Sequence, residues 1–396
     1  MLTYQWLRKT RNTGGGKERI NRDIMKRNTG SDSRKICIFG GASLYRLPLY
    51  NMMADTLDCD FYITRFGDGR DKTIKAYDYA DLKSFREEVV LKPIGGNFNW
   101  NTSIWRLFRM SYKYYVVAGA WDLSSWFLIL LCSLTRKRVI SWSHGIYGRE
   151  VGLRLWIKKT FFKLCHKCLV YNERSRELMI AQGVCPDDVV SVHNSLDYAA
   201  QLPLRGRNSE IFHKHFGNSL PVLFFIGRLI EGKQLDMLID VTDILRRRDI
   251  EVNTVIIGDG PAKTALQDKT EMLKLKDNVW FYGPCYNEEE KSELIASADI
   301  CITPGAIGLT CIDSMMFGTP VITKDDLNNQ GPEYAAIHEG RTGSFFKAND
   351  LNDLADAIEA WLNDHQDREQ TRFNCYQEID NYWTPEYEVE QIKKVF

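Results

Sequence analysis

Two positively charged side chains, Arg228 and Lys233, stand five positions apart after a continuous apolar segment at residues 222–226. The planar guanidinium of an arginine can bind a phosphate through two parallel hydrogen bonds, and a lysine adds a mobile point charge. Gly227 stands directly before Arg228, where the missing side chain lets a ligand approach the backbone. Residues of these types at this spacing can bind a phosphate group and stabilise negative charge that develops on it.

A second set of residues suited to an anion begins at Gly308. Residues 308–316 have the pattern of a helix, which Gly318 and Pro320 would end. The first turn of a helix has free backbone amides, and the helix dipole favours an anion beside them. An ordinary strand-to-helix turn is the alternative explanation. The amides expected at the turn belong to Gly308, Leu309 and Thr310.

Asp313 lies about one helical turn beyond Leu309. A carboxylate repels a phosphate, so we do not expect Asp313 to bind one. Its oxygens accept hydrogen bonds from hydroxyl groups, such as the neighbouring pair on a ribose ring. The sequence therefore predicts that Asp313 binds sugar hydroxyls, and a plain surface aspartate is the alternative.

Four apolar segments, at residues 222–226, 255–257, 279–282 and 298–303, each lead to a glycine and then to a helical pattern. Strands that alternate with helices form right-handed βαβ units and a parallel sheet. Ligands of such sheets bind at the carboxyl ends of the strands. We therefore expect one crevice to be lined by the four glycines, which are Gly227, Gly258, Gly283 and Gly305.

Residues 225–362 resemble the donor-binding domain of retaining glycosyltransferases of the family-4 type, in particular those of bacterial polysaccharide biosynthesis. The resemblance implies the GT-B architecture: two Rossmann-like parallel-sheet domains that face a central cleft, with a C-terminal helix that crosses back to the first domain. Val192 to Asp197 (VHNSLD) also resembles the signature between the two domains. The matching motifs are GRLIEGK, IIGDGP, VWFYG, ADICITP, GLTCIDSMMFGTPVI, Pro332-Glu333 and EGRTG at 339–343.

One motif departs from the family pattern. Members usually carry two glutamates eight positions apart, and here these positions hold Gly305 and Asp313. Asp313 keeps a carboxylate on a shorter arm, whereas Gly305 has no side chain. In the family the first glutamate lies near the donor sugar, so the contacts to that sugar differ in this chain.

His144 follows an apolar segment at residues 139–142. A lone histidine at the end of a strand is commonly structural. The family, however, places a histidine at this strand end beside the donor sugar. We therefore expect His144, together with Arg228 and Lys233, to act in catalysis, and a structural role for His144 is the alternative.

The resemblance implies a metal-independent retaining hexosyltransferase without a cofactor. Its substrates would be a UDP- or GDP-linked sugar donor and a saccharide or lipid-linked saccharide acceptor. Two other functions stay open on this scaffold. One is a catalytically silent nucleotide-sugar-binding partner, which the glycine at position 305 favours. The other is a GT-B-type sugar-nucleotide epimerase or hydrolase, which would need an acidic pair at the sugar.

The first credible core strand lies at residues 35–39 and leads into Gly40 and Gly41, a corner that we assign to the acceptor side. The segment before it is basic and poor in apolar residues, so it predicts a disordered tail. Translation could start at Met1 or at Met25. The predicted parts are a tail at 1–34, an acceptor-binding domain at 35–200, a linker at 201–221, a nucleotide-sugar-binding domain at 222–380 and a returning helix at 381–396.

An amphipathic helix is predicted from Leu153 to Leu169. Its apolar face carries Leu153, Trp156, Ile157, Phe161, Leu164 and Cys168, and its basic face carries Arg154, Lys158, Lys159, Lys163 and Lys167. The helix is either a solvated helix packed on the sheet or a peripheral contact with anionic membrane through Trp156 and Phe161 or Phe162.

Composition limits the remaining classes of function. The formal net charge is zero, which argues against nucleic acid as a partner. The apolar run at residues 126–132 is shorter than the roughly 20 residues of a membrane span. Cys165 and Cys168 have the spacing of a metal or redox pair, but no second pair of ligands stands at a matching distance. We therefore expect no metal site and a cytoplasmic protein, with a peripheral membrane contact as a further option.

Overall fold

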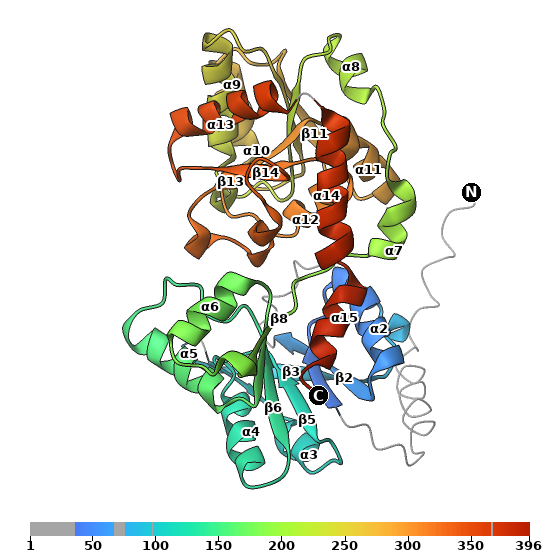
Figure 1. Ribbon diagram of the computed structural model, residues 1–396, viewed down its shortest axis with the longest axis vertical. Coiled ribbons are helices and arrows are strands. Elements are labelled where there is room, and N and C mark those ends of the chain that lie inside the picture. The colour runs from blue at the N-terminus through green and yellow to red at the C-terminus, as the bar shows by residue number, and fades with distance from the viewer. Residues whose placement is uncertain (1–35, 67–75, 97, 366) are drawn as a thin grey trace, which may run out of the picture.

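Two α/β domains lie one above the other along the length of the molecule, and the chain crosses between them near the centre (Figure 1). The computed structural model describes residues 36–66, 76–96, 98–365 and 367–396. The predicted tail at 1–34 lies outside these ranges, as does the choice between Met1 and Met25. The predicted fold class is confirmed, because each domain is built on a largely parallel sheet.

The sheet of the first domain has eight strands in the order β4-β3-β2-β1-β5-β6-β7-β8. β3 and β4 are antiparallel, and the other neighbours are parallel. A strand covered by helices on both faces is a continuous apolar run, as in the fully buried β5. The strands are β1 (Ile36–Gly40), β2 (Cys59–Phe66), β3 (Phe85–Gly95), β4 (Phe98–Asn101), β5 (Tyr114–Val117), β6 (Arg138–Trp142), β7 (Lys167–Val170) and β8 (Val189–Ser191).

The sheet of the second domain has six parallel strands in the order β11-β10-β9-β12-β13-β14. The strand order reverses between β9 and β12. In open α/β sheets ligands bind outside the carboxyl ends of the strands at such a switch point. The strands are β9 (Val222–Ile226), β10 (Asn253–Ile257), β11 (Val279–Gly283), β12 (Ile300–Thr303), β13 (Val321–Lys324) and β14 (Gly343–Phe346).

Helices cover both sheets, and two short helices, α7 and α8, lie in the segment that leads from β8 to β9 (Figure 1). α8 lies at the end of the second domain that is far from the first domain. Those of the first domain are α2 (Leu47–Thr56), α3 (Ile104–Phe108), α4 (Leu123–Ser133), α5 (Gly152–Leu164) and α6 (Glu173–Ala181). They are followed by α7 (Tyr198–Gln201), α8 (Ile211–Phe216), α9 (Leu235–Arg247), α10 (Lys263–Met272), α11 (Glu288–Ser297), α12 (Thr310–Met316), α13 (Leu351–Asp364), α14 (Arg368–Tyr382) and α15 (Pro385–Lys393).

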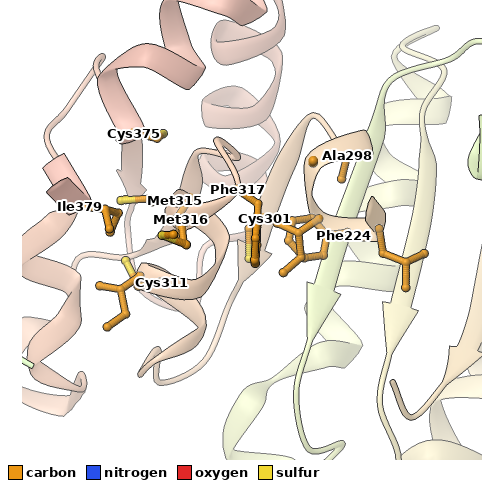
Figure 2. Close-up of a cluster of buried hydrophobic side chains, with 14 of the residues drawn as sticks. Phe224, Ala298, Cys301, Cys311, Met315, Met316, Phe317, Cys375 and Ile379 are labelled. Atoms are coloured by element: carbon orange, nitrogen blue, oxygen red, sulfur yellow. The ribbon is translucent and has the colours of Figure 1, made fainter. Parts of the chain in front are cut away.

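Apolar packing fixes α12 against the second sheet. Figure 2 shows Met315 and Met316 of α12 in one cluster with Phe224 of β9, Cys301 of β12 and Cys375 of α14. Burial of a side chain as large as methionine contributes about 1.5–3 kcal/mol. Since α12 is held in this way, the loop that precedes it at residues 304–309 has a defined position at the switch point.

The last helix packs in the first domain, as the sequence predicts. α14 runs along the second domain, and α15 then lies beside α2 (Figure 1). Val389 and Ile392 of α15 are buried with Leu49 and Met53 of α2. Trp383, which is also buried, lies in the short break between α14 and α15. The chain therefore crosses between the domains twice.

The prediction of a single helix over residues 153–169 is wrong. α5 ends at Leu164, and the chain continues as strand β7 from Lys167. Phe161 and Phe162 are buried in the core of the first domain and cannot contact lipid. The apolar run in β7 is only three residues long, Cys168 to Val170, and so short a run fits a helix as well as a buried strand.

Candidate functional site

The corner after β9 presents Arg228 at the switch point of the second sheet. The amide of Gly227 donates to the carbonyl oxygen of Ile257 (2.9 Å), and the amide of Gly258 donates to that of Gly283 (2.8 Å). A Cβ atom on Gly258 would lie 1.9 Å from the Gly227 carbonyl oxygen, so only glycine permits this approach of the two corners. Arg228 is exposed beyond them, and no Asp or Glu of the described residues forms an ion pair with it.

Lys233 lies on the other side of the same corner. Its Nζ atom donates to the carbonyl oxygen of Ala306 at 2.6 Å. Burial lowers the pKa of Lys233, and the charge of Arg228 lowers it further. The two cations are thus close enough to repel each other. A negatively charged ligand in front of them would relieve this repulsion and favour the charged form of Lys233.

Gly305 brings the loop before α12 into contact with the loop that carries Lys233. The Gly305 amide donates to the Lys233 carbonyl oxygen at 2.9 Å. A Cβ atom on Gly305 would lie 2.3 Å from the carbonyl oxygen of Gly232 and 2.5 Å from the carbonyl carbon of Lys233. Both are backbone atoms that cannot rotate away. In this structure, therefore, position 305 has no room for the glutamate that the family carries there.

The chain just before α12 borders open space at Gly308. No heavy atom lies within 4 Å of the place that a Cβ atom on Gly308 would occupy. α12 begins at Thr310, whose hydroxyl donates to the Ile226 carbonyl oxygen at 3.2 Å. The side chain of Gln330 accepts from the Ile307 amide at 2.7 Å and fixes the loop from the other side. We did not predict Gln330, which stands just before the Pro332-Glu333 motif.

Asp313 points from α12 toward α11 and α7. One of its oxygens lies 3.0 Å from Nζ of Lys291, and the other accepts from the side-chain amide of Gln201 at 2.9 Å. Lys291 is largely buried, and the carboxylates of Asp313 and Glu288 raise its pKa to about 12. A carboxylate has about four acceptor positions, so these two contacts leave capacity for hydroxyl groups. The predicted binding of sugar hydroxyls by Asp313 stays a prediction.

His144 follows β6 and faces the second domain. It lines a cavity between the domains whose other wall includes Gln330 and Tyr334. The ring packs on those of Tyr147 and Tyr171, with centroids 5.7 and 5.0 Å away. Desolvation by the surrounding groups, together with the charges of Arg46 and Lys158, lowers the pKa of His144 to about 4, although the residue has an exposed side. His144 is therefore uncharged at neutral pH.

Gly40 and Gly41 form the corner after β1, beside the switch point of the first sheet. The Gly41 amide donates to the Tyr50 hydroxyl at 3.3 Å, and the Tyr77 hydroxyl donates to the Gly41 carbonyl oxygen at 3.3 Å. The corner is thus held by two tyrosines, and Gly41 itself is exposed. Its predicted place on the acceptor side is not tested by these contacts.

A buried ionic group that we did not predict joins the two chain crossings. Arg46 donates to the Tyr171 hydroxyl at 2.5 Å and lies 3.4 Å from a carboxylate oxygen of Glu388 in α15. The hydroxyl of Ser195 donates to the other oxygen of Glu388 at 2.7 Å. Burial raises the pKa of Glu388 to about 7 despite the nearby Arg46. These residues lie far apart in the sequence, so no local pattern could have indicated the group.

Two further classes of site were searched for. Among the described residues, no three His, Cys, Asp or Glu side chains come together in a way that would hold a metal ion. All ten cysteines are free, Cys165 and Cys168 included. Within the same residues, every helix is too short or too polar to cross a bilayer.

The second domain of the chain matches a family of known proteins. Residues 207–378 match the family model of glycosyl transferases group 1. The alpha-D-kanosaminyltransferase of Streptomyces kanamyceticus is 23% identical over 225 residues, which are 56% of this chain and 57% of that protein. A D-inositol 3-phosphate glycosyltransferase of Paenarthrobacter aurescens is 31% identical over 173 residues, 42% of this chain and 39% of the relative. The chain thus spans about half, or less, of the length of these curated relatives.

The fold is similar to that of solved glycosyltransferase structures over nearly the whole chain. HepE of Anabaena, solved in complex with UDP, aligns with a TM-score of 0.68 and 16% identity. The alignment covers 91% of this chain and 98% of HepE. The lipopolysaccharide outer core galactosyltransferase WaaB aligns with a TM-score of 0.67 and 15% identity, over 91% of this chain and 99% of WaaB. The chain therefore has the two-domain GT-B fold and carries a glycosyl transferases group 1 domain over residues 207–378.

Proposed function

We propose that this protein is a glycosyltransferase that moves a sugar from a UDP- or GDP-linked donor to a saccharide or lipid-linked saccharide in cell-surface polysaccharide biosynthesis. One observation carries the proposal: Arg228 and Lys233 lie at the same switch point, close enough for the charge of Arg228 to lower the pKa of Lys233, and neither forms an ion pair with a carboxylate of the described residues. The family match of the second domain supports the same donor class. HepE, which shares the fold, has been solved with UDP and with UDP-glucose.

In the proposed reaction, negative charge builds up on the diphosphate as its bond to the sugar breaks. Arg228 and Lys233 stabilise this charge more strongly than that of the intact donor, which lowers the barrier. The amides of Gly308, Leu309 and Thr310 add hydrogen bonds to the same group, and Asp313 binds the ribose hydroxyls. The protein supplies the positive charge itself, so the proposal needs no metal and no other cofactor.

The donor sugar then extends toward the first domain and reaches His144. An uncharged imidazole can donate or accept one hydrogen bond to a sugar hydroxyl without repelling a developing positive charge on the sugar. Gly305 contributes no carboxylate, so the sugar is held by fewer charged contacts than in the family pattern. We propose transfer with retention, on the basis of the resemblance to the family-4 type.

We also propose that the protein works at the cytoplasmic face of a membrane, with the first turn of α5 against anionic lipid. Three apolar side chains there are exposed: Val151 (77%), Leu153 (70%) and Trp156 (55%). Arg154 lies among them and is exposed as well. Lys158, by contrast, lies 2.5 Å from a carboxylate oxygen of Glu150, so it does not serve as a lipid contact. An exposed tryptophan between basic residues suits the headgroup region of a bilayer.

The donor site is tested by Arg228→Ala and Lys233→Ala. Each change should lower turnover by roughly 10²- to 10³-fold, which is the effect of losing one donor to a developing negative charge. The measurement is hydrolysis and transfer of radiolabelled UDP- and GDP-sugars. Lys276→Ala is the matched control, because Lys276 is an exposed cation paired with Glu271 in the same domain.

Two outcomes would contradict the proposal. Near-normal turnover in both variants would remove Arg228 and Lys233 from the mechanism. Tight binding of UDP without hydrolysis or transfer of any sugar would instead favour the catalytically silent binder, the alternative that Gly305 keeps open.

A further inference from the structure

A small cavity between the domains lies beside His144. Its wall on the first domain is the start of α6, with Asn172, Arg174 and Ser175. Its wall on the second domain includes Tyr334, in a 3-10 turn at Pro332–Ala336. The cavity is therefore complete only when both domains are in place.

Two polar groups in this cavity lack a hydrogen-bond partner among the described residues. The hydroxyl of Tyr334 is one of them, although the residue is only 7% exposed. The Nε atom of Arg174 is the other, while the Nη2 atom of the same guanidinium donates to Asn328 at 2.8 Å. Buried polar groups are nearly always paired with protein or with ordered water, so these two donors are available to an acceptor, either a water or an anionic group that displaces it, and Asn172 lies beside the Tyr334 hydroxyl.

Arg174 is the cation that lines the cavity, and two carboxylates lie near it: Glu177 acts on Tyr334, and Glu333 acts on Tyr147. No Asp or Glu of the described residues forms an ion pair with Arg174. Glu150, the acid nearest in sequence to His144, is bound to Lys158. The cavity also faces the N-terminal end of α6, which is capped by Asn172. A guanidinium, a phenol hydroxyl and a helix N-terminus are together suited to an oxyanion.

This cavity differs from the donor site. Gln330 lines the cavity, but its side chain is fully used: it accepts from the Ile307 amide and donates to Thr323 and to the Lys324 carbonyl oxygen. Gln330 thus separates the cavity from the loop that precedes α12. Arg228 and Lys233 do not line it.

We propose that this cavity binds an oxyanion carried by the acceptor, either the carboxylate of an acidic sugar or a phosphate ester. The proposal rests on the proposed function, because it assigns a substrate class to the same cleft. In this arrangement Arg174 and Tyr334 bind the anionic group while the acceptor hydroxyl lies toward His144 and the donor sugar. An acceptor with a neutral sugar in the same place would leave the hydrogen-bond donors of Arg174 and Tyr334 without an anionic partner, so such an acceptor would bind more weakly.

The test measures binding to the full-length protein by calorimetry with saturating UDP, so that the donor site is filled. The probes are glucuronate, methyl phosphate and glucose. Glucuronate or methyl phosphate should bind, and glucose should not. Binding of glucuronate alone identifies an acidic sugar, and binding of methyl phosphate alone identifies a phosphate ester. If neither anion binds while UDP does, the cavity proposal is overturned and the proposed function is untouched.

Two variants locate the binding. Arg174→Gln should lower the affinity for the anionic probe by about ten- to a hundredfold, which is the effect of losing a charged hydrogen bond. Tyr334→Phe should lower the affinity for the probe less than Arg174→Gln does. The melting temperature of the free protein should stay the same or rise, because the substitution removes an unpaired buried hydroxyl. Arg136→Gln, at an exposed site in the first domain, is the control. If Arg228→Ala abolishes anion binding and Arg174→Gln does not, the anion occupies the donor site and the inference is wrong.

Discussion

The absence of a side chain at position 305 has a steric cause in this structure. The backbone of Gly232 and Lys233 occupies the space that a Cβ atom would need. The contact also sets the position of Lys233, because the Gly305 amide binds the Lys233 carbonyl oxygen. Glycine at this position therefore provides no carboxylate near the sugar, but it allows close contact between the loop before α12 and the loop that carries Lys233.

Gly305→Ala should therefore disturb both stability and donor binding. Forcing one methyl group against backbone atoms costs about 1–3 kcal/mol, and the displaced loop carries Lys233. We expect a lower melting temperature and weaker UDP binding by calorimetry. Gly232→Ala is the control, since no heavy atom lies within 4 Å of its added Cβ atom. Unchanged UDP affinity in Gly305→Ala would show that the close contact does not control Lys233.

At the residue scale, the sequence indicated the donor-side residues because they stand next to strand ends within short motifs. Arg228 and Lys233 follow β9 and Gly308 follows β12, the two strands at the switch point, while their roles stay predictions. Gln330, Arg174 and Tyr334 carried no such signal. Their roles depend on contacts between segments that are distant in the sequence, so they became visible only in the folded molecule.

Among the elements, α5 has an unusual division of its apolar side chains. Its second half contributes Phe161 and Phe162 to the core, while Leu153 and Trp156 in its first half remain exposed. The loop before it includes Arg149, which donates to Asn329 of the second domain at 2.6 Å. The exposed end of α5 therefore lies beside the cleft, where a lipid-linked acceptor would arrive.

Replacing Leu153 and Trp156 together by serine should weaken binding to anionic vesicles, and so should Arg154→Glu. A basic residue near an anionic surface contributes on the order of 1 kcal/mol, so the charge reversal should reduce binding by about tenfold or more. Cosedimentation with phosphatidylserine vesicles at several salt concentrations measures this, since screening weakens the electrostatic part. Lys276→Glu is the control. If the parent protein ignores such vesicles at low salt, α5 is a solvated helix.

The elements were predictable to different degrees. Four strands of the second domain, β9 to β12, were clear because each is an apolar run that leads to a glycine, whereas β13 and β14 have no glycine after them and were not predicted. β3 and α14 were not expected. Much of β3 is exposed, and α14 has apolar residues without a clear helical period, so neither has a strong hydrophobic pattern. α5 and β7 were joined because two residues separate a helix from a short strand.

At the scale of the whole molecule, the C-terminal helix α15 ties the chain back to the first domain at α2. Because Glu388 is buried in this contact, the stability of the contact depends on pH. The pKa of Glu388 is about 7 in the folded protein, against an ordinary value of 4.5 in the unfolded chain. Between these values the folded protein keeps a proton that the unfolded chain has lost. The contribution of Glu388 to the free energy of unfolding is therefore greatest below about pH 4.5. It falls as the pH rises from about 4.5 to about 7 and does not change further above that.

Glu388→Gln should remove this loss of stability with rising pH, which amounts to at most about 1.4 kcal/mol per pH unit. The measurement is the melting temperature of parent and variant from pH 5 to pH 8. His144 acts in the opposite direction, because its pKa is lowered from 6.5 to about 4. The difference between the two proteins, rather than either curve alone, is therefore the test. A constant difference across the range would contradict the role of Glu388.

The two crossings of the chain touch each other, and this limits how the domains can move. The ring of His193 in the first crossing stacks on Trp383 in the second at 4.6 Å, and His193 Nδ1 lies 3.0 Å from the Tyr382 carbonyl oxygen. Two domains that are connected on one side only can rotate relative to each other about that connection, which then acts as a hinge. The parts of the two domains far from the hinge then move furthest. Between the domains, Arg149 donates to Asn329 and Arg174 donates to Asn328. Opening for substrates would break these charge-assisted hydrogen bonds, together with the one from Asn172 to the Pro332 carbonyl oxygen, and would leave the buried charges at the hinge undisturbed.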